Sequence, residues 1–330
     1  TLPVTQLPAS KCMTVTVAQL GARHHYAVPR VLHAAGMLER FFTDSYSGDK
    51  PRLRAAVTVA DRVYPTAAAK RWLARREPSL PADRIVSFER LGWRYARDQR
   101  RAADARALGG VFARYGAAFN ARVLRHGLGD ADVVFGFNGA ARVLFEAARR
   151  EGRRCVLDQT IAPLAVQHRL LQREKARWPD WQPAWAPEPP DPARLEQEAG
   201  EWAAADLILC PSAFVRDAVG EAGGPVEKCV LVPYGMDMSR FPPPTQRAPP
   251  TGRPMRVLFA GEVGLRKGVP DLLTALRLSG PEHVEARLVG NVRLAPERLE
   301  AYADVATFAG AVPRPAMAAH YAWADLFVLR

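Results

Sequence analysis

Short apolar runs alternate along the chain with stretches in which apolar residues recur every three or four positions. A β-branched run at 13–20 ends at Gly21, and helical spacing follows at 26–38. This order predicts a strand, a glycine turn and a helix. By the same criteria we predict a helix at 140–150, a helix that begins at 191, and strands at 132–137, 154–157, 206–209 and 228–232. Strands that alternate with helices favour a parallel sheet in an α/β fold.

Residues 52–126 interrupt this alternation. They are rich in Arg and Ala, and their apolar residues recur near the helical period over long stretches. We therefore expect one or two long amphipathic helices inserted among the strands.

A proline-rich segment at 241–254 divides the chain. It holds six prolines in fourteen residues, which neither a helix nor a central strand tolerates. We therefore expect a first domain at 1–240, a stiff linker at 241–254 and a second domain at 255–330. In the second domain the pattern restarts and predicts helices at 269–278 and 316–322 and strands at 255–260, 286–289, 305–309 and 325–329.

The predicted second domain is short. It has about half of the ~150 residues that a nucleotide-binding α/β domain needs, and it ends inside an apolar strand. We expect the chain to be a fragment whose natural sequence continues past Arg330.

Length and composition exclude several classes of protein. With 330 residues and 48% apolar residues, the chain can form about two domains with real cores, unlike a disordered, collagen-like or small disulfide-rich protein. The four Cys are far apart, which signals neither a zinc site nor a disulfide framework. Neither a membrane span nor a signal peptide is evident, so we expect a cytoplasmic protein.

The positive charge is concentrated in one region. Residues 51–150 contain 20 Lys and Arg against 9 Asp and Glu, a balance of +11 out of a net charge of +12. Such a region predicts either docking on anionic lipid headgroups or a solvated helix face. It contains no recognisable nucleic-acid-reading module, so nucleic acid is not an expected partner.

The turn 261–268, GEVGLRKG, combines glycines with Arg266 and Lys267 between a predicted strand and a predicted helix. In an open parallel sheet this places the turn at the edge where ligands bind, and the helix N-terminus there favours an anion. The combination suits a diphosphate, although a solvated basic turn would show the same pattern. The fingerprints of P-loop and dinucleotide-binding proteins are absent.

Several segments in order resemble the retaining glycosyltransferases of family 4, which have the GT-B fold. The resemblance is carried by PSAFVRDAV (211–219), KCVLVPYGMDMSRF (228–241), VLFAGEVGLRKGVPDLLTAL (257–276), ARLVG (286–290) and FAGAVPRPAMAAHYAWADLFVL (308–329). It implies an α/β architecture of two Rossmann-like domains that face a cleft, the first binding the acceptor and the second, here incomplete, binding a nucleotide sugar.

The resemblance also implies roles for individual residues. Lys267 matches the lysine that binds the donor diphosphate, with Arg266 beside it, and Tyr234, Gly235 and Asp237 match the loop before the interdomain linker. The remaining donor-binding residues implied are Gly261 and Gly290 in the nucleotide cleft, Gly310 and Val312 at the base, and Gly21 under the donor phosphate. The implied donor is a UDP- or GDP-sugar, and neither a metal nor a cofactor is expected.

The chain departs from the family pattern at three points. Glu262 stands where many members have Arg, which leaves the cationic role to the turn. The loop LDQTIAP has no histidine, so Asp158 and Gln159 become candidates for contacts with the acceptor or sugar. The Glu-x7-Glu segment that contacts the donor sugar would begin beyond Leu329, so no catalytic residue is assigned and the fragment is expected to be inactive.

Other conspicuous side chains leave two interpretations open. His24 could contact the sugar or acceptor, or be an ordinary loop histidine. Trp178, Trp181 and Trp185 could form a lid over the acceptor, or pack a proline-rich connection.

The resemblance implies a retaining hexosyltransferase that acts on a glycan or lipid-linked acceptor in cell-envelope polysaccharide synthesis. Docking of the basic region would place it on the inner face of the plasma membrane. A nucleotide-sugar epimerase of the same fold is a rival, but it would need carboxylate acid/base pairs that the sequence does not reveal. The alternative outside enzymes is a non-catalytic glycosyltransferase-like adaptor that binds a membrane or a partner through its basic helices.

Overall fold

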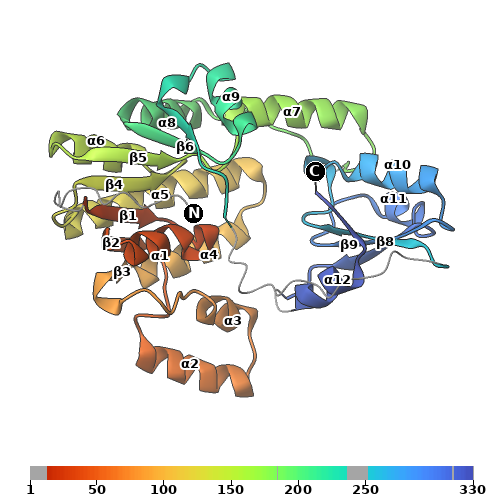
Figure 1. Cartoon of the computed structure of the whole chain (residues 1–330), viewed down its shortest axis with the longest axis horizontal. Coiled ribbons are helices and arrows are strands. Elements are labelled where there is room, and N and C mark those ends of the chain that lie inside the picture. Colours follow the sequence, from red (N-terminus) through yellow and green to blue (C-terminus); the bar gives the residue numbers. More distant parts are fainter. Residues whose placement is uncertain (1–12, 184, 236–251, 314–315, 330) are drawn as a thin grey trace, which may run out of the picture. The chain divides into compact units, whose positions relative to one another are not determined.

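A computed structural model of the chain describes residues 13–183, 185–235, 252–313 and 316–329 (Figure 1). The chain divides into two compact units. The first takes in Thr1–Val166 and Pro190–Tyr234, and the second takes in Gln167–Pro189 and Gly235–Arg330. The sequence predicts a first domain formed by one continuous segment, 1–240. In the structure, residues 167–189 belong to the second unit instead. Most of the predicted linker lies outside the described residues.

The first unit is built on a parallel sheet in the order β3-β2-β1-β4-β5-β6-β7. The strands are β1 (Val15–Gln19), β2 (Leu38–Thr43), β3 (Ile85–Ser87), β4 (Val133–Phe137), β5 (Arg154–Asp158), β6 (Leu207–Cys210) and β7 (Cys229–Leu231). Strands β1 and β4 are buried along their whole length, as expected for the centre of a sheet covered on both faces. All paired strands run parallel, which confirms the predicted α/β class.

Helices connect these strands. They are α1 (Ala27–Ala34), α6 (Arg142–Arg150), α7 (Leu164–Arg177), α8 (Pro192–Ala204) and α9 (Ala213–Glu221). The predicted start of α8 is confirmed: the Asp191 side chain accepts a hydrogen bond from the Ala193 N–H, and Pro192 occupies the first turn. The division between the two units falls inside α7.

The prediction of a helical insertion at 52–126 is confirmed, but the prediction of only one or two long helices is wrong. The region forms α2 (Pro51–Val63), α3 (Ala67–Leu73), α4 (Glu89–Arg101) and α5 (Ala105–His126), with β3 between α3 and α4. Thr66 caps α3 by accepting from the Ala69 N–H, and Asp104 caps α5 by accepting from the Ala107 N–H. These caps start new helices where the apolar spacing alone suggested continuity.

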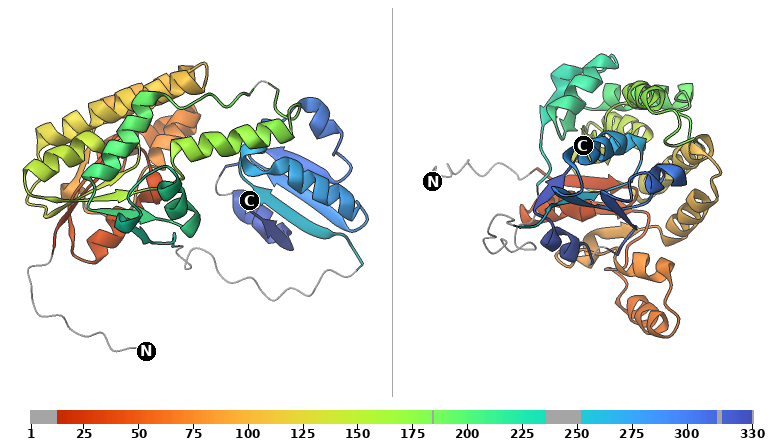
Figure 2. Two further views of the ribbon diagram at one scale, coloured as in Figure 1. Left: turned by 90° about the horizontal axis from the view of Figure 1, so that it is seen from above. Right: turned by 90° about the vertical axis from the view of Figure 1, so that its right-hand side faces the viewer.

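The second unit is built on a smaller parallel sheet in the order β10-β9-β8-β11, with strands β8 (Met255–Ala260), β9 (Val284–Val289), β10 (Ala306–Gly310) and β11 (Leu326–Val328). All four strands are close to their predicted ranges. The helices of this unit are α10 (Val269–Ser279), α11 (Pro296–Glu300) and α12 (Met317–Trp323), and both views in Figure 2 show α10 alongside the sheet.

The tryptophans of 167–189 pack into the core of the second unit. Trp181 is buried there with Val263 and Leu265, and Trp178 and Trp185 pack against the same cluster. The packing interpretation of these side chains is therefore confirmed for Trp181. Among the described residues, no helix is both long and apolar enough to cross a membrane.

Candidate functional site

Three glycines follow one another along the carboxyl edge of the second sheet. Gly261 follows β8, Gly290 follows β9 and Gly310 ends β10, and their φ angles are 157°, 150° and 69°. The Gly261 N–H donates to the Val289 carbonyl at 2.9 Å, and the Gly290 N–H donates to the Gly310 carbonyl at 2.9 Å. The edge is therefore a continuous backbone surface that carries no side chains at these three positions.

Position 290 requires a glycine both because of its φ angle and because the backbone of Gly261 packs closely against it. A Cβ atom placed there would lie 1.7 Å from the Gly261 carbonyl oxygen. Val312, also expected at this edge, is half-buried in the loop that follows β10. The sequence-predicted residues Gly261, Gly290, Gly310 and Val312 thus share one edge of the sheet, the edge where ligands bind in open parallel sheets.

The basic turn lies at the same edge. Leu265 is buried in the core and its N–H donates to the Gln182 side chain, which fixes the short helical turn η5 (Leu265–Lys267). Gly268 adopts a left-handed conformation at the start of α10. Arg266 is exposed and Lys267 is half-buried, and neither side chain has a hydrogen bond or an ion pair with any residue that the structure describes.

The neighbouring charges in this unit are paired, which sets the two turn residues apart. Glu262, directly after the strand glycine, lies 3.5 Å from Arg293, and Asp271 in the first turn of α10 binds Arg177 at 2.9 Å. The acids closest in sequence to the turn are therefore occupied by other cations. Arg266 and Lys267 remain available for an anionic ligand.

At the carboxyl edge of the first sheet, the loop after β1 is strained. His24, His25 and Tyr26 have φ angles of 49°, 49° and 64°, so three consecutive non-glycine residues are left-handed. Such residues cost about 1–2 kcal/mol each and concentrate at functional sites.

Buried polar groups hold this loop in place. The Gln19 amide donates to the carbonyls of Gly21 and Arg23, and the Gly21 N–H donates to Asp44 Oδ1 at 2.8 Å. Asp44 is itself buried and paired with Arg75 at 2.8 Å. The Gly21 N–H is therefore not free to donate to a phosphate. Gly21 can only allow a phosphate to approach the backbone closely, because it has no side chain.

His24 and Asp158 are brought together from 134 positions apart. His24 Nε2 lies 3.1 Å from Asp158 Oδ2, and the Tyr234 ring packs against the imidazole with a centroid distance of 4.6 Å. Burial, and then the charge of Asp158, raise the pKa of Tyr234 to about 12. The Tyr234 hydroxyl, neutral at ordinary pH, donates to the Thr160 carbonyl at 3.1 Å.

Arg23 adds a cation that sequence reasoning missed. Its guanidinium donates to Thr160 Oγ1 and the Asn138 carbonyl and lies over the Phe137 ring. Burial lowers the pKa of Arg23, against the opposing effect of acids such as Asp158. The only sequence signal was its place in a loop after a buried strand.

Gln159 has a supporting position. It is fully buried, its oxygen accepts from Trp202 Nε1 at 3.0 Å, and its nitrogen donates to the Ile161 carbonyl. Its side chain is thus satisfied inside the core, whereas Asp158 beside it contacts His24.

Two buried glutamates on α8 support the loops of this edge. Glu201 accepts from the Gly139 and Ala141 N–H groups, and burial raises its pKa. Glu198 accepts from the Leu164 N–H at the start of α7, and burial raises its pKa to about 7. Both carboxyl groups satisfy backbone groups at the turns of the sheet edge.

Metal binding has no obvious location in the described parts of the chain. No three His, Cys, Asp or Glu side chains cluster there in a way that could hold an ion. Cys155, Cys210 and Cys229 are free thiols.

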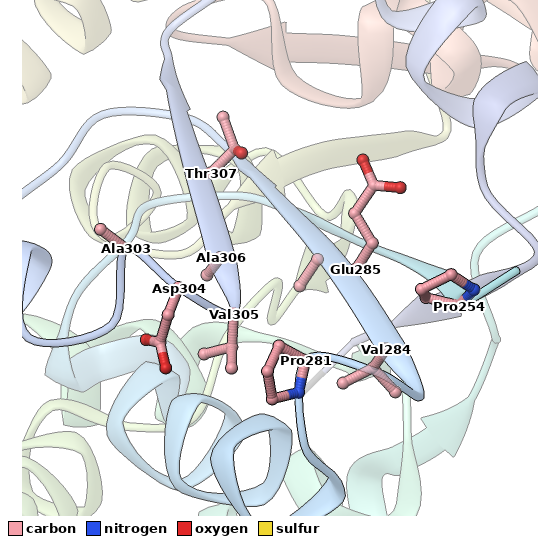
Figure 3. A pocket seen from close by; sticks show the side chains of 10 residues that line it. Pro254, Pro281, Val284, Glu285, Ala303, Asp304, Val305, Ala306 and Thr307 are labelled. Carbon is pink, nitrogen blue, oxygen red and sulfur yellow. The ribbon is translucent and has the colours of Figure 1, made fainter.

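A pocket lies at the opposite, amino edge of the second sheet (Figure 3). Pro254, Pro281 and Val284 line it together with the acids Glu285 and Asp304. Its acids are paired with Arg256 at 3.7 Å and Arg277 at 2.8 Å. Because it is far along the strands from the glycine edge, it takes no part in the site proposed below.

Comparisons with known proteins identify the fold. No protein-family model and no curated protein matches the sequence. Among solved structures, sucrose-phosphate synthase from Thermosynechococcus elongatus matches with a TM-score of 0.58 and 15% identity, over 96% of this chain and 75% of that chain. The fold is that of the GT-B glycosyltransferases.

Two further matches have lower scores. HepE of Anabaena, solved with UDP-glucose, has a TM-score of 0.49 and 14% identity, over 96% of this chain and 73% of that chain. The lipopolysaccharide outer core galactosyltransferase WaaB has a TM-score of 0.47 and 12% identity, with coverages of 96% and 73%. At 15% identity, the likeness to sucrose-phosphate synthase is evidence of fold and not of reaction.

Proposed function

We propose that the chain is a retaining glycosyltransferase of family 4 that transfers a hexose from a UDP- or GDP-sugar. Its acceptor is a growing glycan or lipid-linked saccharide of a cell-envelope polysaccharide, and it acts in the cytoplasm. The observation that carries the proposal is a pair of cations, Arg266 and Lys267, that lie beside the glycine edge of β8, β9 and β10 and have no partner among the described residues.

The leaving group of the proposed reaction is a nucleoside diphosphate. Negative charge grows on it as the bond to the sugar breaks, so cations held in place before the reaction lower the barrier. Arg266 and Lys267 would neutralise this charge without a metal ion, through charge-assisted hydrogen bonds. The glycine edge lets phosphate and ribose approach the backbone closely, and the backbone at Val312 would hold the base.

The first unit supplies the groups suited to hydroxyl recognition. His24, aligned by Asp158, and Arg23 are hydrogen-bonding groups at the carboxyl edge of its sheet. We propose that they contact the acceptor or the donor sugar, and that Gly21 allows the donor phosphate to pack closely.

Binding of UDP and GDP, measured by isothermal titration calorimetry, tests the diphosphate site. Lys267→Ala is expected to weaken the preferred nucleotide about 10- to 100-fold, since a hydrogen bond to a charged group contributes about 1.5–3 kcal/mol. Lys267→Arg keeps the charge and is expected to retain part of the affinity. Arg150→Ala, which removes an exposed cation of the first unit, is the matched control and is expected to bind as the unmodified chain does.

Equal affinity of Lys267→Ala and the unmodified chain would overturn the assignment of the turn. If neither nucleotide bound, the glycosyltransferase proposal itself would fail and the adaptor hypothesis would replace it. The anomeric configuration of a transferred sugar, read by NMR, tests retention separately.

A further inference from the structure

Helix α2 presents its apolar side chains to solvent. Leu53, Val59 and Val63 are 44%, 60% and 65% exposed, and Ala56 and Ala60 are exposed as well. Positions 53, 56, 59, 60 and 63 lie on one face of a helix because they recur every three or four residues. In a helix that only packs on a core, this face would be buried. None of the α2 side chains is buried.

The opposite face of α2 is half-buried and consists of Val57 and the polar residues Arg54, Thr58 and Asp61. Thr58 donates to the Arg54 carbonyl, and Asp61 accepts from the Thr66 N–H at the start of α3. The link between Asp61 and Thr66 fixes the turn between the two helices. In the hairpin of α2 and α3 (residues 51–74), the mostly polar face of α2 is therefore half-buried and its apolar stripe is exposed.

The hairpin is also strongly basic. It contains five cations, Arg52, Arg54, Arg62, Lys70 and Arg71, and one acid, Asp61. The cations other than Arg54 are exposed, and none of those four has an acidic partner in the described part of the chain. An anionic partner would complement this charge.

The hairpin is attached firmly to the first unit although it stands apart from the sheet (Figures 1 and 2). Trp72 Nε1 donates to Glu89 Oε2 at 3.0 Å, and Ser47 Oγ contacts the Leu73 and Arg75 carbonyls. Glu89, at the start of α4, also accepts from Ser45 and from the Tyr46 N–H. The apolar stripe is thus held at the surface by a rigid base.

We propose that the α2–α3 hairpin docks the protein on an anionic lipid bilayer. The stripe of Leu53, Val59 and Val63 enters the headgroup region, and Arg52, Arg62, Lys70 and Arg71 bind lipid phosphates. A bilayer surface is apolar and anionic at once, which matches both features of the hairpin. A nucleic acid would complement the cations but leave the stripe exposed. This inference goes beyond the proposed sugar transfer and needs no sugar nucleotide to be tested.

Cosedimentation of the whole chain with vesicles tests the proposal. We expect binding to vesicles of equal parts phosphatidylglycerol and phosphatidylcholine, much weaker binding to pure phosphatidylcholine, and weakening as salt rises. Each cation near an anionic surface contributes about fivefold, so R52Q/R62Q is expected to weaken binding about 25-fold. V59S/V63S, which leaves the charge unchanged, is expected to weaken it at least tenfold by removing buried apolar area.

Matched controls separate the hairpin from net charge and general surface polarity. R125Q/R150Q removes two exposed cations outside the hairpin, and V143S changes an exposed valine of α6, 45% exposed; both are expected to bind as the unmodified chain does. All altered residues are exposed, so circular dichroism should report unchanged folding. The vesicle assay contains no UDP or GDP, so its result is independent of the nucleotide-binding test.

Three outcomes would overturn the proposal. Equal binding to both kinds of vesicle would show that the cations of the hairpin do not bind lipid phosphates. If R125Q/R150Q weakened binding as much as R52Q/R62Q, binding would depend on net charge rather than on the hairpin. If light scattering showed a dimer that V59S/V63S dissolves while vesicles failed to bind, the stripe would be a contact between copies of the chain.

Discussion

At the scale of single residues, the strained turn at His24 is the strongest indication of chemistry in the first unit. Three left-handed residues follow one another directly after Arg23, whose carbonyl accepts from Gln19, and the first of them, His24, contacts Asp158. Local sequence preference would not choose this conformation, because β-carbon crowding disfavours it at every step. The surrounding contacts therefore offset a strain that places His24 against a buried carboxylate.

Asp158→Asn tests whether this arrangement serves the reaction. The amide keeps the shape but loses the charge that aligns the imidazole. In a protein that is active in sugar transfer, kcat is therefore expected to fall tenfold or more with little change in the KM of the donor. Tyr234→Phe is the control, because it keeps the ring against His24 and loses one hydrogen bond to the Thr160 carbonyl. Full kcat in Asp158→Asn would remove His24 and Asp158 from the proposed site.

Gly290 offers a test of the glycine edge in the second unit. Gly290→Ala would place a Cβ atom against the Gly261 carbonyl and strain a φ of 150°, so it is expected to destabilise this unit by about 3 kcal/mol or more. Gly310→Ala is the matched control: φ is 69° but the space around it is open, so a cost of about 1 kcal/mol is expected. Urea unfolding measures the free energy of unfolding of both variants. Equal destabilisation would show that the close approach of the Gly261 carbonyl to Gly290 does not require a glycine there.

At the scale of elements, the sequence predicts those strands and helices that are determined by residues close together in the chain. The observed β8 coincides with the predicted 255–260 because a largely apolar run, MRVLFA, ends there before a glycine. Strand β2 was missed because Glu39 and Arg40 interrupt its apolar residues; it is identified only by its pairing with β1. Strand β3 has three residues and is defined by its pairing with β2 alone.

The same distinction applies to the candidate sites. Arg266 and Lys267 could be found from the sequence because strand, turn and helix follow each other locally. The contact between His24 and Asp158 joins two loops 134 positions apart, and Arg23 carries no motif. Asp158 and Gln159 were equivalent candidates until the packing of α8 showed that Gln159 binds Trp202 in the core.

Glu89 is the residue on which the base of the α2–α3 hairpin depends. Burial alone would raise the pKa of Glu89, but hydrogen bonds from Tyr46, Ser45 and Trp72 outweigh it and lower the pKa below its usual value. Glu89→Gln is expected to destabilise the first unit by about 1–3 kcal/mol and to speed amide exchange in α2 and α3.

The pH dependence of this effect has a definite sign. A carboxyl group whose pKa is lowered by folding adds stability above its unfolded pKa of 4.5, and this stability is lost as pH falls through the lower folded pKa. The stability difference between the unmodified chain and Glu89→Gln should therefore be full near pH 7 and shrink below about pH 4.5. Urea unfolding at several pH values measures it, and a difference independent of pH would mean that the carboxylate charge is not what binds the hairpin.

At the scale of the whole molecule, the two units share one helix. The chain passes from the first unit to the second inside α7, whose first N–H, at Leu164, is bound by Glu198. Glu198 and Glu201 lie one turn apart on α8 and are both buried, so neither is well solvated when ionised. The start of the shared helix is therefore tied to a carboxyl group that titrates within the physiological range.

Because burial raises the pKa of Glu198 to about 7, its effect on stability is opposite to that of Glu89. The folded chain keeps a proton that the unfolded chain loses near pH 4.5, so the stability of the first unit falls as pH rises from about 4.5 to about 7 and then levels. We expect a fall of about 1–3 kcal/mol over this window. Glu198→Gln, which cannot ionise, should lose this part of the slope and keep the part due to Glu201. Calorimetry between pH 5 and 8 measures it, and parallel pH profiles for the two proteins would mean that Glu198 is ionised throughout and binds Leu164 as a carboxylate.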